Sequence, residues 1–315
     1  MTSKVSVIIP AFNAAWCITD ALESVRSQFY REYEVVVVND GSTDDTKETV
    51  EKFFSSADLP SGKLINQANK GLGGARNTGL REANGEYVAF LDADDVWYPT
   101  KLSRMMSVFA EVPADVGLLC HDEVASRDGN FVRVLRYGPY ADDMYRRLLL
   151  GGNCLSPSAV VARKNVVENA GGFSEDPNVH SVEDYDLWLR LSRQTKFRFV
   201  HEVLGNYRLH SDSLGSDPEY NLRHLLNVLD RHIREYSRLR NLTVIDHFLI
   251  RLRRSRAFRG ASRLARWKGD GEQAFAYAMA SVATCPVSAK NWISVLQSVV
   301  ATMKKKQDVG LTVIS

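Results

Sequence analysis

The chain has 315 residues, of which 44% are hydrophobic and 25% are charged. Both fractions are close to the averages for globular domains, which excludes a disordered chain, a collagen-like repeat and a low-complexity scaffold. The formal net charge of +2 is the sum of two unlike parts: residues 1–219 carry 23 Lys and Arg against 32 Asp and Glu (−9), whereas residues 220–315 carry 17 against 6 (+11).

The N-terminus leads directly into a short apolar run at residues 5–9. It lacks the apolar stretch of ~7–15 residues and the small-residue cleavage site of a signal peptide. Apolar runs elsewhere, such as residues 35–38, are far shorter than the ~18–20 residues of a membrane span. The four cysteines are far apart and form no CxxC pair, so we expect buried thiols in a reducing cytoplasm, with neither a disulfide framework nor a zinc site.

The first 100 residues alternate short β-branched segments with helical patterns, which is typical of parallel β-α-β units. Strands are predicted at residues 5–10, 34–39, 63–66 and 86–91. Helices are predicted at residues 15–28, 46–54 and 71–83, and Pro99 stands near the start of another helix, a position that proline tolerates.

The pattern loosens from Gly117 onward. Strands are predicted at residues 117–120, 158–161, 197–200 and 204–209, with a short helix at 183–193 and a polar and aromatic stretch at 122–145. From about residue 221 the chain is predicted to be helical almost to its end, with breaks at 269–271 and at Pro286. Residues 261–292 are predicted to form a helical hairpin with close packing at Ala274, Ala278 and Ala283.

Carboxylates gather where the predicted strands end. Asp40 ends the second strand, and Asp92, Asp94 and Asp95 follow the fourth. In an open α/β sheet, ligands bind beyond the carboxyl ends of the strands. Hard cations such as Mg²⁺ and Mn²⁺ prefer carboxylate oxygens and complete their shell with phosphates and water. These residues are therefore candidates for a cation and nucleotide site, although Asp-rich turns also cap helices.

Two common phosphate-binding loops are absent from the sequence. There is no Walker-type G-x-x-x-x-G-K-[ST], and the first strand is followed by Ala11-Phe12-Asn13 where a dinucleotide fold places G-x-G-x-x-G. The glycine-rich segment at residues 71–76 begins a helix. It could bring backbone N–H groups or Arg76 to an anion, or it could serve only for close packing.

Six segments, taken in order, resemble glycosyltransferase family 2, whose members have the GT-A fold. They are VSVIIPAFN (5–13), VVVNDGSTDDT (36–46), NKGLGGARN (69–77), FLDADD (90–95), EDYDLWLRL (183–191) and YRLH (207–210). The resemblance covers about residues 4–215 and does not extend over the last part of the chain.

The resemblance implies an α/β fold of the GT-A type, a Rossmann-like mixed sheet flanked by helices, over residues 1–218. Residues 1–100 would form the nucleotide-binding half and 101–218 the acceptor half, followed by an additional basic C-terminal helical region at 219–315. The implied activity is that of an inverting, metal-dependent glycosyltransferase. It would move a sugar from a nucleoside diphosphate sugar, expected to be UDP-linked, to a hydroxyl acceptor in polysaccharide, glycolipid or cell-surface glycan synthesis.

The resemblance also implies which residues border the donor. One group would contact the base, the ribose, the phosphates or the donor sugar, with Asp40 accepting a hydrogen bond from the base. The nucleotide-binding residues of this group are Pro10, Ala11, Asn13, Asp40, Arg76 and Asp92.

By the same resemblance, Asp94 would bind a Mn²⁺ or Mg²⁺ ion that bridges the diphosphate. His210 would supply a further metal ligand or a diphosphate contact. Asp184 would be the catalytic general base, and like charges on the neighbouring Glu183 and Asp186 would raise its pKa. Acidic residues at a helix start also favour the helix itself.

The basic tail supports two interpretations. The predicted helix at residues 292–303 has Trp292, Leu296, Val299 and Met303 on one face and continues into Lys304-Lys305-Lys306. Such helices suit an anionic membrane surface, and equally a helical subdomain packed on the catalytic half. We therefore expect a cytoplasmic protein. Peripheral contact with the inner face of the membrane stays open as an alternative. No nucleic-acid-binding motif is present, so no nucleic acid partner is expected.

Two other functions stay open from the sequence. The chain could be a catalytically silent nucleotide-sugar-binding module recruited by its helical tail. It could also be a nucleotidyltransferase, although the opening segment lacks the Gly-rich, Arg/Lys-bearing loop expected there. Loops at residues 122–157 and around His180 are expected to select the donor sugar and the acceptor.

Overall fold

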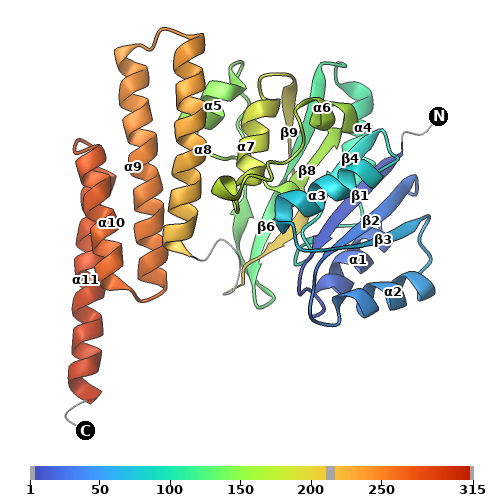
Figure 1. Cartoon of the computed structure of the whole chain (residues 1–315), viewed down its shortest axis with the longest axis horizontal. Helices are drawn as coiled ribbons and strands as arrows, with labels where there is room; N and C mark the ends of the chain where they lie inside the picture. The colour runs from blue at the N-terminus through green and yellow to red at the C-terminus, as the bar shows by residue number, and fades with distance from the viewer. Residues whose placement is uncertain (1–3, 211–216, 313–315) are drawn as a thin grey trace. The chain divides into compact units, whose positions relative to one another are not determined.

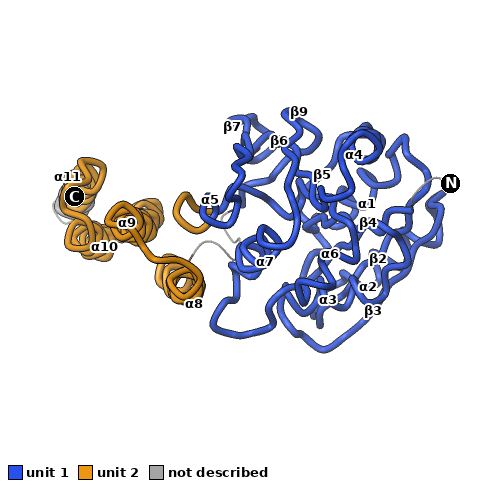
Figure 2. The backbone as a smooth tube through the Cα atoms, turned by 90° about the horizontal axis from the view of Figure 1, so that it is seen from above, with its two compact units in different colours: residues 1–148, 153–210 blue, residues 149–152, 211–315 orange. Residues whose placement is uncertain are grey.

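The computed structural model describes residues 4–210 and 217–312, with side chains up to residue 302. These residues form two compact units (Figure 2). Unit 1 consists of residues 1–148 and 153–210, and unit 2 of residues 149–152 and 211–315. Met303 and Lys304–Lys306 lie outside the described side chains.

Unit 1 is built on one mixed sheet (Figure 1). The strand order is β3-β2-β1-β4-β8-β6-β9-β5, with β7 paired to β6. Strands β1 to β4 are mutually parallel, and β8 runs antiparallel to both β4 and β6. The strands span Val5–Ala11 (β1), Tyr33–Asp40 (β2), Gly62–Gln67 (β3), Tyr87–Phe90 (β4), Val96–Trp97 (β5), Val116–Arg127 (β6), Asn130–Leu135 (β7), Val160–Arg163 (β8) and Lys196–Arg208 (β9).

Helices connect the strands of unit 1 and make up most of unit 2. The first seven are Ile18–Arg26 (α1), Thr46–Ser56 (α2), Gly71–Glu82 (α3), Lys101–Glu111 (α4), Met144–Gly151 (α5), Lys164–Asn169 (α6) and Glu183–Leu191 (α7). Unit 2 contains Pro218–Leu239 (α8), Val244–Trp267 (α9), Gly271–Thr284 (α10) and Ala289–Thr312 (α11).

Strand β1 is buried along its whole length, as expected for a parallel strand that is covered on both faces. Successive side chains point to opposite faces. Val7 and Ile9 belong to the core formed with α1, α2 and α4. Ile8 faces α3, where a Cβ atom on Gly79 would lie 2.3 Å from its Cγ2, so the glycine permits close packing. Helix α3, which carries Arg76, is thereby fixed against the sheet.

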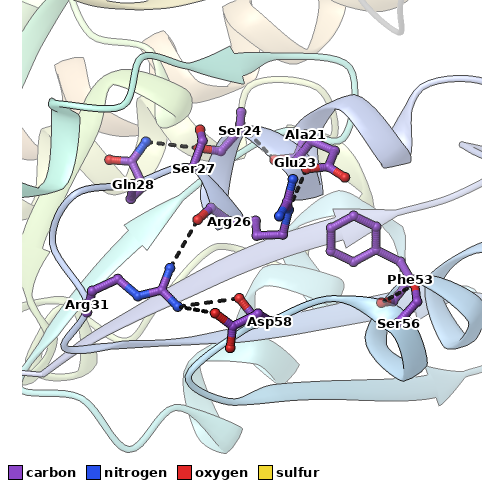
Figure 3. Close-up of polar contacts among 10 residues, drawn as sticks. All are labelled: Ala21, Glu23, Ser24, Arg26, Ser27, Gln28, Arg31, Phe53, Ser56 and Asp58. Atoms are coloured by element: carbon purple, nitrogen blue, oxygen red, sulfur yellow. Dashed lines mark hydrogen bonds and ion pairs between the residues drawn. The ribbon is translucent and has the colours of Figure 1, made fainter.

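Side chains also fix the connection from α1 to β2 (Figure 3). Arg31 donates hydrogen bonds to the carbonyl of Arg26 (3.2 Å) and to the carboxylate of Asp58 (3.4 Å). Gln28 donates to the carbonyl of Ser24 (3.0 Å). These contacts set the direction in which the chain enters β2, whose other end contributes to the candidate site.

Glu34, at the start of β2, is a buried carboxylate at the amino end of the parallel strands. Its Oε1 accepts hydrogen bonds from the Ser6 hydroxyl and the Asn84 backbone N–H (2.6 Å each), and its Oε2 accepts one from Lys4 (3.0 Å). Burial by itself raises the pKa of Glu34, but the hydrogen bonds outweigh burial and lower the pKa to about 2. Glu34 therefore stabilises the fold as a charged group, far along β2 from Asp40.

The predicted elements of the first 100 residues are all found, whereas the later part of unit 1 differs. The strand predicted at 117–120 continues as β6 to Arg127 and turns through Asp128 and Gly129 into β7, within the polar and aromatic stretch at 122–145 where no strand was predicted. Both turn residues have positive φ (50° and 76°), as in a two-residue hairpin turn. The strands predicted at 197–200 and 204–209 form one continuous strand, β9. Helices α5 and α6 were not predicted.

In unit 2, α9 and α10 form a hairpin. Its turn lies at the predicted break at residues 269–271, and α10 ends at Thr284, close to the predicted break at Pro286. Ala274 and Ala278 are fully buried, as predicted, but Ala283 is exposed because it lies on the opposite side of α10. A further chain break separates α8 from α9, where Thr243 and Asp246 form a capping box.

None of the helices in the described part of the chain is long and apolar enough to cross a bilayer.

Candidate active site

The carboxyl ends of the parallel strands meet at one edge of the sheet. Ala11 at the end of β1 is opposite Asn39, and Asp40, the next residue of β2, is opposite Gln67 at the end of β3. The segment that contains Asp92 and Asp94 follows directly after β4. Ala11, Asp40 and the segment of Asp92 and Asp94 therefore lie at the edge where ligands bind in open α/β sheets.

The loop after β1 is tied to the loop after β2 by the side chain of Asn13. The Oδ1 atom of Asn13 accepts a hydrogen bond from the Thr43 backbone N–H (2.8 Å), and its own N–H donates to the Ser42 hydroxyl (3.0 Å). Asn13 has a φ of 49°, a left-handed conformation that asparagine tolerates better than most residues. Pro10 and Ala11 are buried just before it. Pro10, Ala11 and Asn13 thus lie at the carboxyl end of β1, next to the end of β2 that carries Asp40.

Asp40 is buried and held by two donors. Its Oδ1 accepts hydrogen bonds from the Gln67 side chain (2.7 Å) and from the Lys70 backbone N–H (2.9 Å). The carboxylate therefore connects the end of β2 to the segment before α3. Its predicted contact with a nucleobase stays a prediction.

The glycine-rich start of α3 serves close packing. A Cβ atom on Gly71, which has a φ of 75°, would lie 2.0 Å from the Nε2 atom of His180, and one on Gly73 would lie 2.6 Å from the carbonyl oxygen of Ser174. The chain before α7 thus lies directly against the first turn of α3.

Arg76, one turn further along α3, bridges two carboxylates. Its side chain is 1% exposed and donates hydrogen bonds to Asp92 (2.6 Å) and to Glu183 (2.9 Å). The guanidinium also lies 5.1 Å from the centre of the Phe173 ring. Glu183 begins α7 and is 107 positions from Arg76 in the sequence. This ion-pair bridge therefore joins the acidic segment after β4 to the start of α7, a link that the sequence did not indicate.

Asp94 and His210 lie close enough to affect each other electrostatically. Burial raises the pKa of Asp94 to about 6, and the charge of Asp92 adds to this, while His210 opposes it. The imidazole of His210 packs edge-on against the exposed Trp16 ring, with centroids 4.7 Å apart. Within the described part of the chain, the Nε2 atom of His210 is buried and has no hydrogen-bond partner.

These residues fit a divalent cation. Asp94 is a carboxylate whose charge interacts with His210, and the Nε2 atom of His210 has no hydrogen-bond partner among the described residues. Oxygen and imidazole donors suit Mn²⁺ and Mg²⁺. Among the described residues, no three His, Cys, Asp or Glu side chains form a complete metal cage. A cation here would therefore need further ligands, which Mg²⁺ usually takes from phosphates and water.

Asp184 stands beside Glu183 at the start of α7. Its Oδ1 accepts a hydrogen bond from the Tyr185 backbone N–H (2.6 Å), and its Oδ2 accepts one from the Asn153 side chain (3.2 Å). Burial raises the pKa of Asp184 to about 7, and the negative charge of Glu183 adds to this effect. Asp186, which was predicted to contribute, instead forms an ion pair with Arg190 (2.9 Å).

Behind the acidic segment lies a layer of buried polar side chains, of which sequence reasoning singled out only Asp95. Asp95 is 1% exposed, and Lys101, His121, Glu123 and Ser158 are fully buried. Burial raises the pKa of Glu123 to about 7 and lowers that of Lys101. The sequence pattern does not distinguish these buried polar residues from exposed ones, because not all of the strands and helices around them were predicted. The Asp128-Gly129 turn was the one signal that could have placed Glu123 on a strand.

A protein-family model, glycosyl transferase family 2, matches residues 6–171. An uncharacterized glycosyltransferase of Nostoc sp. is 36% identical over 213 residues, which cover 66% of this chain and 65% of the relative. WfgD of Escherichia coli, a UDP-Glc:alpha-D-GlcNAc-diphosphoundecaprenol beta-1,3-glucosyltransferase, is 30% identical over 232 residues, or 71% of this chain and 85% of the relative. The matched segment thus spans slightly less than two thirds of the first of these relatives.

Two solved structures are similar in fold. Residues 1–349 of Staphylococcus aureus TarS in complex with UDP-GlcNAc superpose with a TM-score of 0.61 and 21% identity, covering 94% of this chain and 79% of TarS 1–349. The mannosyltransferase PcManGT of Pyrobaculum calidifontis, in complex with GDP-Man and Mn²⁺, gives a TM-score of 0.60 and 20% identity over 97% of this chain and 87% of its own. At these identities the likeness concerns the fold.

Proposed function

The chain belongs to glycosyl transferase family 2 and has the predicted GT-A fold with a C-terminal helical region, and from this premise we propose that it is an inverting, metal-dependent glycosyltransferase. Its donor would be a UDP-linked sugar and its acceptor a hydroxyl group of a glycan or glycolipid. WfgD acts on a lipid-linked sugar with UDP-Glc, and TarS binds UDP-GlcNAc, which support these classes. The observation that supports the proposal is the Arg76 bridge, which pairs with Asp92, two residues before Asp94, and with Glu183, the residue before Asp184.

In this proposal the residues of the edge divide into two groups. Asn13 and Asp40 would border the nucleoside and Asp92 the ribose or donor sugar, whereas Asp94 and His210 would hold Mn²⁺ or Mg²⁺. When bound, such an ion acts as a Lewis acid that stabilises the negative charge of the leaving diphosphate. The complex of PcManGT with Mn²⁺ supports a divalent ion in this fold.

Asp184 would act on the acceptor. As the acceptor hydroxyl attacks the anomeric carbon, its proton moves to a carboxylate oxygen of Asp184, while the bond from that carbon to the diphosphate breaks. One base opposite the leaving group gives a single displacement and therefore inversion. Asn153 and the Tyr185 backbone N–H, which donate to Asp184, would hold the carboxylate in place for this transfer.

A pH profile tests the role of the base. Asp184 has a pKa of about 7 and is faced by Glu183 on α7, Arg76 on α3 and Asp92 after β4. Because only the deprotonated carboxylate accepts a proton, we expect kcat/KM to rise with pH and to level off above about 7. Initial rates in a constant-ionic-strength buffer series measure this profile. A rate that does not change between pH 6 and pH 8 would contradict the assignment.

The direct test of the proposed function is release of nucleoside diphosphate. A panel of UDP- and GDP-sugars is first screened for Mn²⁺-dependent thermal stabilisation, since a ligand that binds the native state raises its apparent stability. The best donor is then incubated with hydroxyl acceptors, and release of the diphosphate is measured with and without a chelator. Binding of donors without any acceptor-dependent release would instead support the silent binding module.

We also propose that unit 2 contacts an anionic membrane surface from the cytoplasm, as a glycolipid acceptor would require. Arg251, Arg256 and Arg263 of α9 are exposed. Large apolar side chains that are also exposed on α10 and α11 are Phe275, Met279, Trp292, Ile293, Leu296 and Val300. Exposed apolar area and positive charge together favour anionic lipid.

Liposome flotation of the intact chain tests the membrane contact. We expect flotation with anionic vesicles but not with neutral ones, and a loss of flotation in the Ile293→Glu, Leu296→Glu double variant, because both changes place charge on the exposed side of α11. An intact chain that stays unbound to anionic vesicles would instead favour packing of the tail within the protein.

A further inference from the structure

We propose that Asp95 is a positioning residue that holds the segment of Asp92 and Asp94 and the end of β9 before His210 in one fixed arrangement. The proposal rests on the proposed function, since Asp94 and His210 are the residues expected to bind the cation. Asp95 itself is 1% exposed, behind the edge of the sheet.

Both carboxylate oxygens of Asp95 are engaged by distant parts of the chain. Oδ1 accepts a hydrogen bond from the Arg208 backbone N–H (2.9 Å), and Oδ2 accepts one from the Ser158 hydroxyl (2.6 Å). The two partners are 113 and 63 positions away in the sequence. Asp95 therefore joins three segments at one point.

The first of these links leads to Asp92. The Oγ atom of Ser158 accepts a hydrogen bond from the Asp92 backbone N–H (3.1 Å). The Ser158 carbonyl is fixed in turn, because it accepts bonds from the Lys101 ammonium (2.7 Å) and the Trp97 indole (2.8 Å). Ser158 is fully buried, so these bonds are not shared with bulk water. The backbone of the acidic segment is thereby anchored from behind.

The second link leads to His210. Arg208 is the last residue of β9, and the next backbone N–H, of Leu209, donates to the Ser126 carbonyl (2.8 Å). Two successive backbone N–H groups directly before His210 are thus held in place. Pairing of β5 with β9 brings Val96, the residue after Asp95, opposite Asn206. One buried carboxylate therefore sets the spacing between the two residues expected to hold the ion.

A direct metal contact by Asp95 is a different role, and the geometry favours positioning. Both oxygens of Asp95 already accept bonds, whereas the Nε2 atom of His210 has no hydrogen-bond partner among the described residues. Partners behind a metal site typically change affinity by ~10–100-fold when removed. An asparagine at position 95 keeps an oxygen for the Arg208 N–H and a polar group for Ser158, whereas alanine keeps neither.

The test is isothermal titration of the full-length chain with UDP at several Mn²⁺ concentrations and with a chelator. In Asp95→Ala and in Ser158→Ala we expect the Mn²⁺-dependent gain in UDP affinity to fall by about tenfold or more. In Asp95→Asn we expect it to stay within about threefold of the wild type. The matched control is Glu34→Ala, which removes another buried, hydrogen-bonded carboxylate and should lower the melting temperature without changing the Mn²⁺ dependence.

The outcomes separate the two levels of the proposal. If wild-type UDP binding does not depend on Mn²⁺, the proposed function fails. If the wild type depends on Mn²⁺ and both Asp95→Ala and Ser158→Ala retain that dependence, the positioning role fails and the proposed function stands. If Asp95→Asn loses as much of the Mn²⁺-dependent gain in UDP affinity as Asp94→Ala, Asp95 is a direct metal ligand, and the positioning role is also overturned. Should Asp95→Ala not fold, Ser158→Ala and Asp95→Asn decide the question.

Discussion

Asp184→Asn is expected to abolish sugar transfer while leaving metal-dependent UDP binding intact. The amide has nearly the shape of the carboxylate and can still accept the Tyr185 N–H bond, but it cannot take a proton from the acceptor hydroxyl. General base catalysis contributes typically ~10²–10⁴-fold, so kcat should fall by about that factor. Diphosphate release under saturating donor and acceptor measures kcat, and calorimetry with UDP and Mn²⁺ measures binding.

Asp186→Asn provides the matched control, since it changes the same residue type on the same helix. Asp186 is buried and paired with Arg190, so its loss should reduce stability rather than turnover. The two variants should therefore separate catalysis from folding. An Asp184→Asn enzyme with near-normal turnover would remove this residue from the base role.

Asp94→Ala is expected to lose both turnover and the metal dependence of nucleotide binding. Asp94 is the carboxylate whose charge interacts with His210, the other residue proposed to hold the ion. Loss of a Lewis acid removes several kcal/mol of transition-state stabilisation, so turnover should fall by about two to three orders of magnitude. UDP titrations with Mn²⁺ and with chelator measure the binding effect in wild type and variant.

Asp45→Ala is the control for the loss of one acidic residue near the edge. Asp45 stands at the start of α2, is exposed, and makes no side-chain capping bond there. We expect both turnover and Mn²⁺ dependence to be retained. The assignment of Asp94 is wrong if a chelator leaves the UDP affinity of the wild type unchanged.

The fold could be predicted where the pattern of apolar residues was clear. Strands β1 and β2 each contain a run of buried β-branched residues, so both their positions and their parallel arrangement were predicted, and the GT-A fold is confirmed. The pattern failed at β6, where His121, Asp122 and Glu123 interrupt the alternation although all three are buried. A run of charged residues is indistinguishable from a surface loop until the partners that neutralise it are known.

The candidate site was predictable to a similar degree. Asp40, Asp92 and Asp94 could be located because they follow strands, and the carboxyl ends of parallel strands share an edge. The Arg76–Glu183 ion pair and the bonds of Asp95 could not be, since they join residues more than 60 positions apart through side-chain geometry. The residues next to them in the sequence show no periodic pattern that predicts such contacts.

The Arg76 bridge has a consequence for how a donor could enter. Both ends of this guanidinium are engaged by Asp92 and Glu183, and the other arginine close to Asp94, Arg208, is paired with Asp20 at 2.8 Å. A diphosphate would thus approach an edge rich in carboxylates whose arginines already balance other charges. A cation that arrives with the nucleotide would reduce the repulsion between the diphosphate and these carboxylates, so we expect donor and ion to bind together more tightly than either binds alone.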